Sequence, residues 1–200
     1  MASLPEPAGP PDFDTRPCEP LRSTLPLWIS ECVACGYAAE DLSSASEAAV
    51  AVVRSDEFAQ ARVEALVTPE ARKFLVYAFL LDRLNQPADA GWSSLHGAWA
   101  TDDLGDAAGA IHCRQKAVAY WRRGKAEGVN FGADLVSEFA LITDVYRRAG
   151  EFEQATVACS EGLDNDDVPP ALEAVLRRQL TLIQRRDVTA HSLAELLSQK

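Results

Sequence analysis

The 200-residue sequence lacks an apolar run long enough to cross a membrane, and it is poor in basic charge. It contains 19 Lys and Arg against 30 Asp and Glu, which gives a formal net charge of -11. Because such a chain repels phosphates unless its basic residues cluster, nucleic acid and anionic membrane are disfavoured as partners. The first residues contain neither the basic nor the apolar region of a secretory signal, which predicts a cytoplasmic protein.

The sequence also lacks the short motifs of common enzyme classes. No P-loop, Gly-x-Ser-x-Gly, His-Glu-x-x-His or dinucleotide fingerprint occurs. His96, His112 and His191 are scattered, and the acidic stretches 102–103 and 164–167 have no base positioned beside them by the sequence. Surface or half-buried histidines and solvated acidic turns are therefore expected, and the chain is predicted not to be an enzyme.

The five cysteines are an odd number, which argues against a closed disulfide framework. Cys113 and Cys159 fall within helical patterns and are expected to behave as small core residues. The other three cysteines lie in the first fifth of the chain, so any thiol chemistry is predicted there.

Cys32 and Cys35 are the strongest candidates for a chemical site. They follow a predicted strand at 25–30 and precede Gly36, and this order is typical of a zinc knuckle with a tight glycine turn. Structural zinc takes four ligands, so Cys32 and Cys35 with Cys18 as a candidate third ligand predict an incomplete zinc site. A redox pair is the alternative, although such pairs normally open a helix in a βαβ pattern that this sequence does not show.

Two regions differ in composition. Residues 1–40 are predicted to form an arm with a cysteine knuckle, and residues 41–200 a helical-repeat domain. Seven prolines precede the cysteine pair, and because each fixes φ and removes a backbone donor, this arm should be irregular. They are Pro5, Pro7, Pro10, Pro11, Pro17, Pro20 and Pro26.

From residue 41 onward, apolar residues recur at helical spacing almost without interruption. Thr68 before Pro69 is typical of a helix N-cap, and Ser192 with Glu195 is typical of a capping box. Breaks at proline- and glycine-containing stretches separate the helices. The sequence therefore predicts an all-α fold.

An internal repeat is visible within the helical region. Residues 141–163 resemble a tetratricopeptide repeat, in which Gly150 permits the turn between two antiparallel helices and Ala155 lets them approach closely. Gly105 and Ala110 stand 45 residues before this pair, and a glycine-rich break explains why the spacing exceeds the usual ~34 residues. The predicted architecture is a stack of tetratricopeptide-like antiparallel helical repeats preceded by a short irregular or β arm.

Four stretches occur in a fixed order: "PDFDTRP" at 11–17, a Trp followed by "CVACGYAA" within 28–39, "AWATDD" at 98–103 and "VYRRAGEFEQA" at 145–155. In this order they resemble an uncharacterised bacterial family known as a domain of unknown function. The resemblance implies a zinc-ribbon-like N-terminal knuckle, tetratricopeptide-like helices and no assigned activity. Family members carry an earlier Cys-x-x-Cys upstream of the "PDFDTRP" segment, and this sequence shows none there.

Three explanations of that departure stay open: a truncated start, a decayed site, or ligands supplied from elsewhere, such as a second copy in a homodimer. Zinc is the one cofactor that the sequence suggests. The predicted function is a non-enzymatic interaction scaffold of tetratricopeptide-like type whose partner is a protein or peptide. The alternative is a zinc-binding or redox-responsive regulatory module that uses Cys32 and Cys35.

Other side chains have two interpretations each. The basic pairs at 122–123, 147–148 and 185–186 complement helix dipoles, or else they line a groove for an anion or an acidic peptide. Trp92, Trp99 and Trp121 are expected to be interhelical core rather than the lining of a groove.

Overall fold

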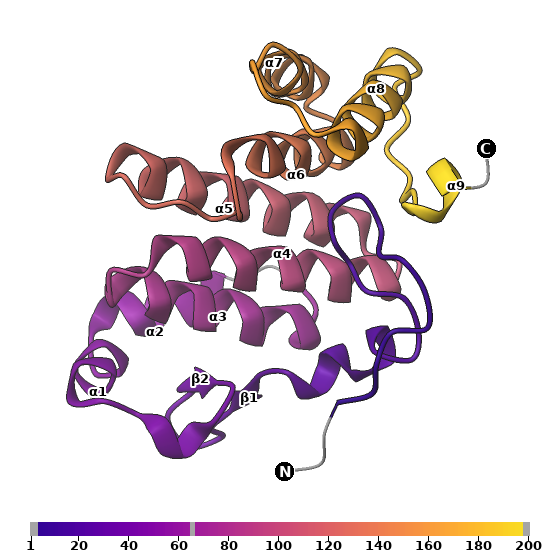
Figure 1. Cartoon of the computed structure of the whole chain (residues 1–200). Helices are drawn as coiled ribbons and strands as arrows, with labels where there is room; N and C mark the ends of the chain where they lie inside the picture. Colours follow the sequence, from indigo (N-terminus) through magenta and orange to yellow (C-terminus); the bar gives the residue numbers. More distant parts are fainter. Residues whose placement is uncertain (1–3, 65–66, 198–200) are drawn as a thin grey trace. The chain divides into compact units, whose positions relative to one another are not determined.

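The computed structural model describes residues 4–64 and 67–197 of the chain (Figure 1). The first three residues of the predicted arm, residues 65–66 and the last three residues lie outside the described ranges. Contacts divide the chain into two units. The central unit is Leu25–Phe131, and the terminal unit joins Met1–Thr24 to Gly132–Lys200. The division of the sequence at residue 40 stays a prediction.

Helices make up most of both units, so the predicted all-α helical fold is confirmed. The central unit contains strands β1 and β2, the 3-10 helix η2 and helices α1 to α5, and the 3-10 helix η1 spans the start of this unit. The bounds are η1 Arg22–Leu27, β1 Ser30–Glu31, β2 Ala38–Ala39, η2 Leu42–Ser44, α1 Glu47–Val53, α2 Asp56–Glu64, α3 Pro69–Arg83, α4 Pro87–Asp103 and α5 Ala107–Ala126. The terminal unit contains α6 Leu135–Arg148, α7 Phe152–Leu163, α8 Pro170–Gln184 and α9 Ala194–Leu197.

The strand predicted at 25–30 is largely wrong. The 3-10 helix η1 covers its first half, and β1 begins only at Ser30, where it pairs antiparallel with β2. Pro26 has no N–H to donate to a sheet, and the N–H of Trp28 donates to the carbonyl of Leu25, which closes a turn. The apolar stretch therefore coils before the hairpin starts.

Small residues let the helices of the central unit approach closely. Helix α4 packs against both α3 and α5. A Cβ at Gly91 of α4 would lie 2.1 Å from Nε1 of Trp121 on α5, so glycine is required where the indole crosses α4. Ala110 of α5 is 2 % exposed, as the repeat pattern predicts.

Small residues also allow close helix packing in the terminal unit. Helix α6 packs against α7 and α8, and Ala155 of α7 is fully buried. A Cβ at Gly162 would lie 2.9 Å from Cβ of Phe139 and 3.0 Å from Cδ1 of Leu176. The predicted small residues are therefore buried in the helix packing of both units.

The turns after α4 and α6 have the same backbone hydrogen bonds. The Asp106 N–H donates to the Thr101 carbonyl (3.0 Å), and 45 residues later the Glu151 N–H donates to the Tyr146 carbonyl (2.9 Å). Gly105 and Gly150 have φ of +74° and +77°, the left-handed conformation of a Schellman cap. The glycine turns predicted from the repeat are confirmed.

The predicted helix caps are confirmed as well. The Thr68 hydroxyl accepts from the Ala71 N–H, with Pro69 opening α3. The Glu195 carboxylate accepts from the Ser192 N–H (3.3 Å), and the Ser192 hydroxyl accepts from the Ala194 N–H (3.2 Å). These contacts satisfy backbone donors that a helix start leaves unpaired.

The N-terminal arm of the terminal unit is irregular, and it pairs with the segment that follows α8. The Phe13 N–H donates to the His191 carbonyl and the Leu193 N–H to the Pro11 carbonyl, both at 2.9 Å.

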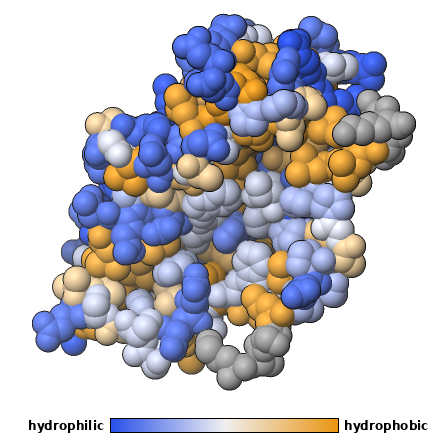
Figure 2. All heavy atoms as spheres, viewed as in Figure 1, coloured by the Kyte–Doolittle hydropathy of each residue, from blue (hydrophilic) through white to orange (hydrophobic). Residues whose placement is uncertain are grey.

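On the face seen in Figure 2, hydrophilic residues cover much of the surface and apolar residues show between them. Within the described ranges, none of the helices combines the length and apolarity needed to span a bilayer.

Candidate functional site

A groove of about 370 Å³ lies on one face of the central unit, between α2, α3 and α5. Positions four apart on a helix share a face, and α3 and α5 each contribute three such positions. The lining residues are Glu57, Gln60 and Ala61 from α2, Leu75, Phe79 and Arg83 from α3, and His112, Lys116 and Tyr120 from α5. The groove is therefore built from rows of side chains on regular helices.

Aromatic rings fix one side of the groove. Phe58 of α2 is 1 % exposed and packs on Phe79, with 6.2 Å between ring centroids, so α2 is held on α3. The Arg83 guanidinium lies 5.0 Å from the centroid of Phe79, and its Nη2 is 3.2 Å from Oε2 of Glu57. A cation–π contact and an ion pair thus order this wall of the groove.

The α5 wall offers polar groups with defined protonation. Burial raises the pKa of Tyr120 to about 12, so its phenol is neutral near pH 7. Burial and the nearby Lys116 ammonium lower the pKa of His112, so its imidazole is neutral there too. Lys116 is exposed and forms no ion pair with the described residues. The groove thus combines aromatic surface with an ammonium group available to a ligand.

Sequence reasoning did not identify this groove. A usable signal was present, because Leu75, Phe79 and Arg83 follow each other at four-residue steps, as do His112, Lys116 and Tyr120. Such rows indicate one face of a helix, but they do not say which two faces lie side by side.

The predicted cysteine turn forms in the central unit. Cys32 and Cys35 lie in the loop of the β1–β2 hairpin, where the Gly36 N–H donates to the Cys32 carbonyl (2.7 Å) and Gly36 has φ of +77°. Val33, between the two cysteines, is 101 % exposed. Hydrogen bonds from the backbone N–H groups of Cys35 and Ala34, and then from the Cys35 thiol, lower the pKa of the half-buried Cys32 thiol.

Two arginines tie the hairpin to the helices. Nη2 of Arg62 on α2 and Nη2 of Arg72 on α3 each lie 3.3 Å from a carboxylate oxygen of Glu31. The Arg62 side chain also lies across the turn, since a Cβ at Gly36 would be 2.1 Å from its Nε. The turn therefore needs glycine both for its φ and for the space that Arg62 occupies.

The remaining cysteines lie elsewhere. Cys18 belongs to the terminal unit, where its thiol donates to the Gly9 carbonyl at 3.1 Å. Cys113 and Cys159 are fully buried, as predicted, and burial raises their pKa values to about 12 and about 11. Over residues 4–64 and 67–197, no three His, Cys, Asp or Glu side chains gather in a way that could hold a metal. Zinc binding stays a prediction.

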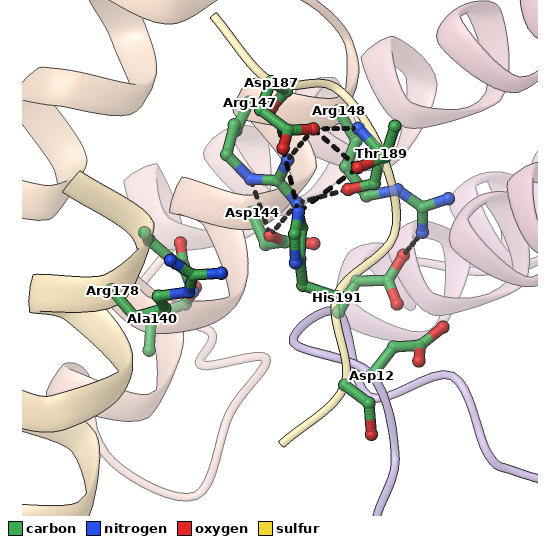
Figure 3. A network of polar contacts seen from close by, with 12 residues as sticks. Asp12, Ala140, Asp144, Arg147, Arg148, Arg178, Asp187, Thr189 and His191 are labelled. Carbon is green, nitrogen blue, oxygen red and sulfur yellow. Dashed lines mark hydrogen bonds and ion pairs between the residues drawn. The ribbon is translucent and has the colours of Figure 1, made fainter. Parts of the chain in front are cut away.

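The basic pair of α6 does not line an open groove. Arg147 is fully buried, and its Nη2 lies 2.6 Å from Oδ1 of Asp144 (Figure 3). Its Nη1 donates to the Asp187 carbonyl at 2.5 Å, and the Arg148 guanidinium pairs with the buried Asp14 carboxylate. Arg147 therefore holds the segment after α8 against α6, and Arg148 holds the N-terminal arm against the same helix.

The tryptophans are mainly core, as predicted. Trp99 and Trp121 are 2 % and 0 % exposed, whereas Trp92 is half-buried. The His96 ring lies between Trp99 and Trp28, with centroid distances of 4.7 and 5.1 Å. Burial lowers the pKa of His96 to about 4, so this imidazole is neutral at pH 7.

Acidification is expected to destabilise the protein through His96. Its folded pKa of about 4 lies below the unfolded value of ~6.5, so the unfolded state binds the proton between these values. The contribution of the neutral His96 imidazole to the free energy of unfolding is fully present above pH ~6.5. We expect the free energy of unfolding to fall by about 2 kcal/mol between pH 7 and pH 5. Urea unfolding at both pH values measures the change.

The His96→Phe variant keeps an aromatic ring and removes the titration. Most of the loss between pH 7 and pH 5 should therefore disappear in it, and an unchanged loss would contradict the assignment to His96. Since the pKa of His112 is also lowered, a small loss of the same sign should remain.

Comparisons of the chain with protein-family models, with curated proteins and with solved structures give no match. The resemblance of its four stretches to a bacterial family therefore stays a prediction.

Proposed function

We propose that the chain is a non-enzymatic protein-interaction module that binds a partner's peptide segment in the α2–α3–α5 groove. The observation that carries this proposal is the combination of half-buried aromatic rings with an uncommitted ammonium group, Lys116, in one groove. Aromatic side chains are enriched in protein interfaces and supply most of the binding energy there.

The chemistry of the lining defines the partner segment. Phe79 and Tyr120 offer apolar surface for one large side chain, and a groove of about 370 Å³ is at the small end of ligand sites. Lys116 favours a carboxylate beside that side chain. We infer a segment with an aromatic or aliphatic anchor next to Asp or Glu.

The net charge of -11 limits how such a partner binds. Long-range repulsion opposes an acidic segment, but at physiological salt the Debye length is about 8 Å. Short-range contact with Lys116 therefore decides recognition, and moderate affinity with fast exchange is expected.

A displayed library of random peptides tests the proposal with the full chain as bait. Selected peptides should share an apolar anchor flanked by Asp or Glu, and Lys116→Glu should weaken their binding about tenfold, measured by fluorescence anisotropy of a labelled peptide. Phe79→Ala should weaken it by about thirtyfold or more.

The matched control is Lys125→Glu, which makes the same charge change on α5 at an exposed position outside the groove. It should leave the affinity within about twofold. If Lys116→Glu and Lys125→Glu weaken binding equally, or if the selected peptides share no anchor, peptide binding in the groove is wrong.

A further inference from the structure

We propose that the β1–β2 hairpin sets the affinity of the groove, and that Arg62 is the positioning residue through which the hairpin acts. Helix α2 forms one wall of the groove, and Arg62 in its last turn ties that helix to the hairpin. The inference rests on the proposed function, because it concerns how tightly the same groove holds its peptide. The hairpin contributes no lining residue, so it would control the groove from outside.

Little of helix α2 is buried. Among the side chains that the structure describes at 56–63, Phe58 is the one that is buried. Phe58 fixes the start of the helix on Phe79, and the ion pair of Glu57 lies at the same end. A helix of nine residues is too short to be stable without such contacts. Arg62 supplies contacts at the other end.

The Arg62 side chain is directed at the hairpin and not into the groove. Ala61 lines the groove, whereas Nη2 of the adjacent Arg62 lies 3.3 Å from Oε1 of Glu31. Nη1 of Arg62 donates to the Cys35 carbonyl at 3.5 Å, and the side chain passes over Gly36. One guanidinium therefore contacts both the first strand of the hairpin and its turn.

The hairpin itself is fixed to α3. Ala38 and Ala39 of β2 are 0 % and 4 % exposed, and β2 packs against α3. Nη2 of Arg72 on α3 lies 3.3 Å from Oε2 of Glu31, whose other carboxylate oxygen pairs with Arg62. Because α3 forms another wall of the groove, the hairpin holds two groove walls at a set separation.

The affinity of the groove depends on that separation. The groove is about 370 Å³, so a small outward movement of α2 would take Gln60 and Ala61 out of contact with an anchored side chain. A peptide would then have to bring α2 back. Its apparent affinity would fall with the fraction of molecules in which α2 is displaced.

Hydrogen exchange and peptide affinity test the proposal together. Arg62→Ala removes the contacts with the hairpin and leaves a good helix former in α2. The backbone amides of α2 should exchange about fivefold faster, and those of α4 should be unchanged. Peptides selected for the groove should bind about fivefold more weakly, measured by fluorescence anisotropy. Arg62→Lys keeps a cation but cannot reach Glu31 and the Cys35 carbonyl together, so it should restore part of the affinity.

The matched control is Arg72→Ala, which removes the other cation from the Glu31 carboxylate and changes no residue of α2. Since β2 still fixes the hairpin to α3, neither the exchange of α2 nor the peptide affinity should change by more than about twofold.

Gly36→Ala perturbs α2 from the hairpin side. Its Cβ would lie 2.1 Å from Nε of Arg62, so the arginine has to move and the peptide affinity should fall about fivefold. In the Arg62→Ala background the same change should alter the affinity by less than about twofold. The strain at the φ of +77° is present in both backgrounds, so this cycle separates strain in the turn from the contact with Arg62.

Equal effects of Arg62→Ala and Arg72→Ala would overturn the proposal, as would faster exchange of α2 without a loss of affinity. An Arg62→Ala variant that binds the peptides as tightly as the parent, while Lys116→Glu still weakens them, would overturn control by the hairpin and leave peptide binding in the groove standing. Failure of Lys116→Glu to differ from Lys125→Glu would instead overturn the groove itself.

Discussion

Replacement of Arg147 by methionine is expected to destabilise the protein by about 3–5 kcal/mol. The Arg147 and Asp144 side chains are 0 % and 1 % exposed, so the variant leaves a carboxylate buried without its cation. It also removes the donors to the carbonyls of Asp187 (2.5 Å) and Thr189 (3.0 Å). Methionine keeps most of the apolar stem, so the loss reports mainly on these polar contacts.

Urea unfolding followed by circular dichroism measures this loss. The matched control is Arg177→Met, which breaks an exposed pair with Glu173 on α8 and should cost less than about 1 kcal/mol. The double variant Asp144→Asn with Arg147→Met should recover part of the stability, because the uncompensated charge is gone. Equal effects of the two arginine variants would show that burial does not matter here.

The pH dependence of the Arg147→Met variant has a definite sign. Burial raises the pKa of Asp144, and the Arg147 cation opposes that rise. Without the cation the folded state holds a proton on Asp144 to higher pH, so the variant gains stability relative to the parent as the pH falls. Its loss relative to the parent should therefore be smaller at pH 5 than at pH 8.

Replacement of Trp121 by alanine is expected to cost about 3–5 kcal/mol in the central unit. The side chain is fully buried, its ring stacks on Phe131 with 4.6 Å between centroids, and it meets Trp92 edge-on at 5.5 Å. Its Nε1 donates to the Ala88 carbonyl at 3.1 Å. Alanine would leave a cavity between α4 and α5 and would leave that carbonyl without this donor.

Trp121→Phe separates the cost of the cavity from the cost of the lost hydrogen bond. It keeps an aromatic ring between α4 and α5 and removes only the N–H donor and part of the side-chain volume. It should cost roughly 1–3 kcal/mol, about half of the alanine effect or less. Both variants are measured by urea unfolding and by the near-ultraviolet circular dichroism of the aromatic cluster. A loss below about 1.5 kcal/mol for the alanine variant would mean that α4 and α5 close the gap on their own.

Much of the helical fold could be predicted because its signals are local. Cap residues such as Thr68 and Ser192 act within one turn of a helix, and Gly105 and Gly150 act on their own backbone. The strand at 25–30 was mispredicted because it was placed across Pro26, which has no N–H to donate to a sheet and lies inside the 3-10 helix η1. The sequence therefore predicts helix ends and turns well where the deciding contacts lie within one turn of the backbone.

The candidate sites depend on partners that are distant in the sequence. Arg148 reaches Asp14 and Arg147 reaches Asp187, and no periodicity connects these positions. The groove likewise needs α2, α3 and α5 to meet, which follows from packing around α4 and not from any one segment. Only the cysteine turn could be located in advance, because its two thiols are three residues apart.

The pairing of the N-terminal arm with the segment after α8 has a consequence for synthesis of the chain. Pro11 and Phe13 are translated early, but their partners at 191–193 leave the ribosome after both units have been almost completely made. The arm must therefore wait, while the central unit can already fold on the ribosome. Closing so long a loop costs entropy and is slow, so the arm should be the last part of the terminal unit to fold.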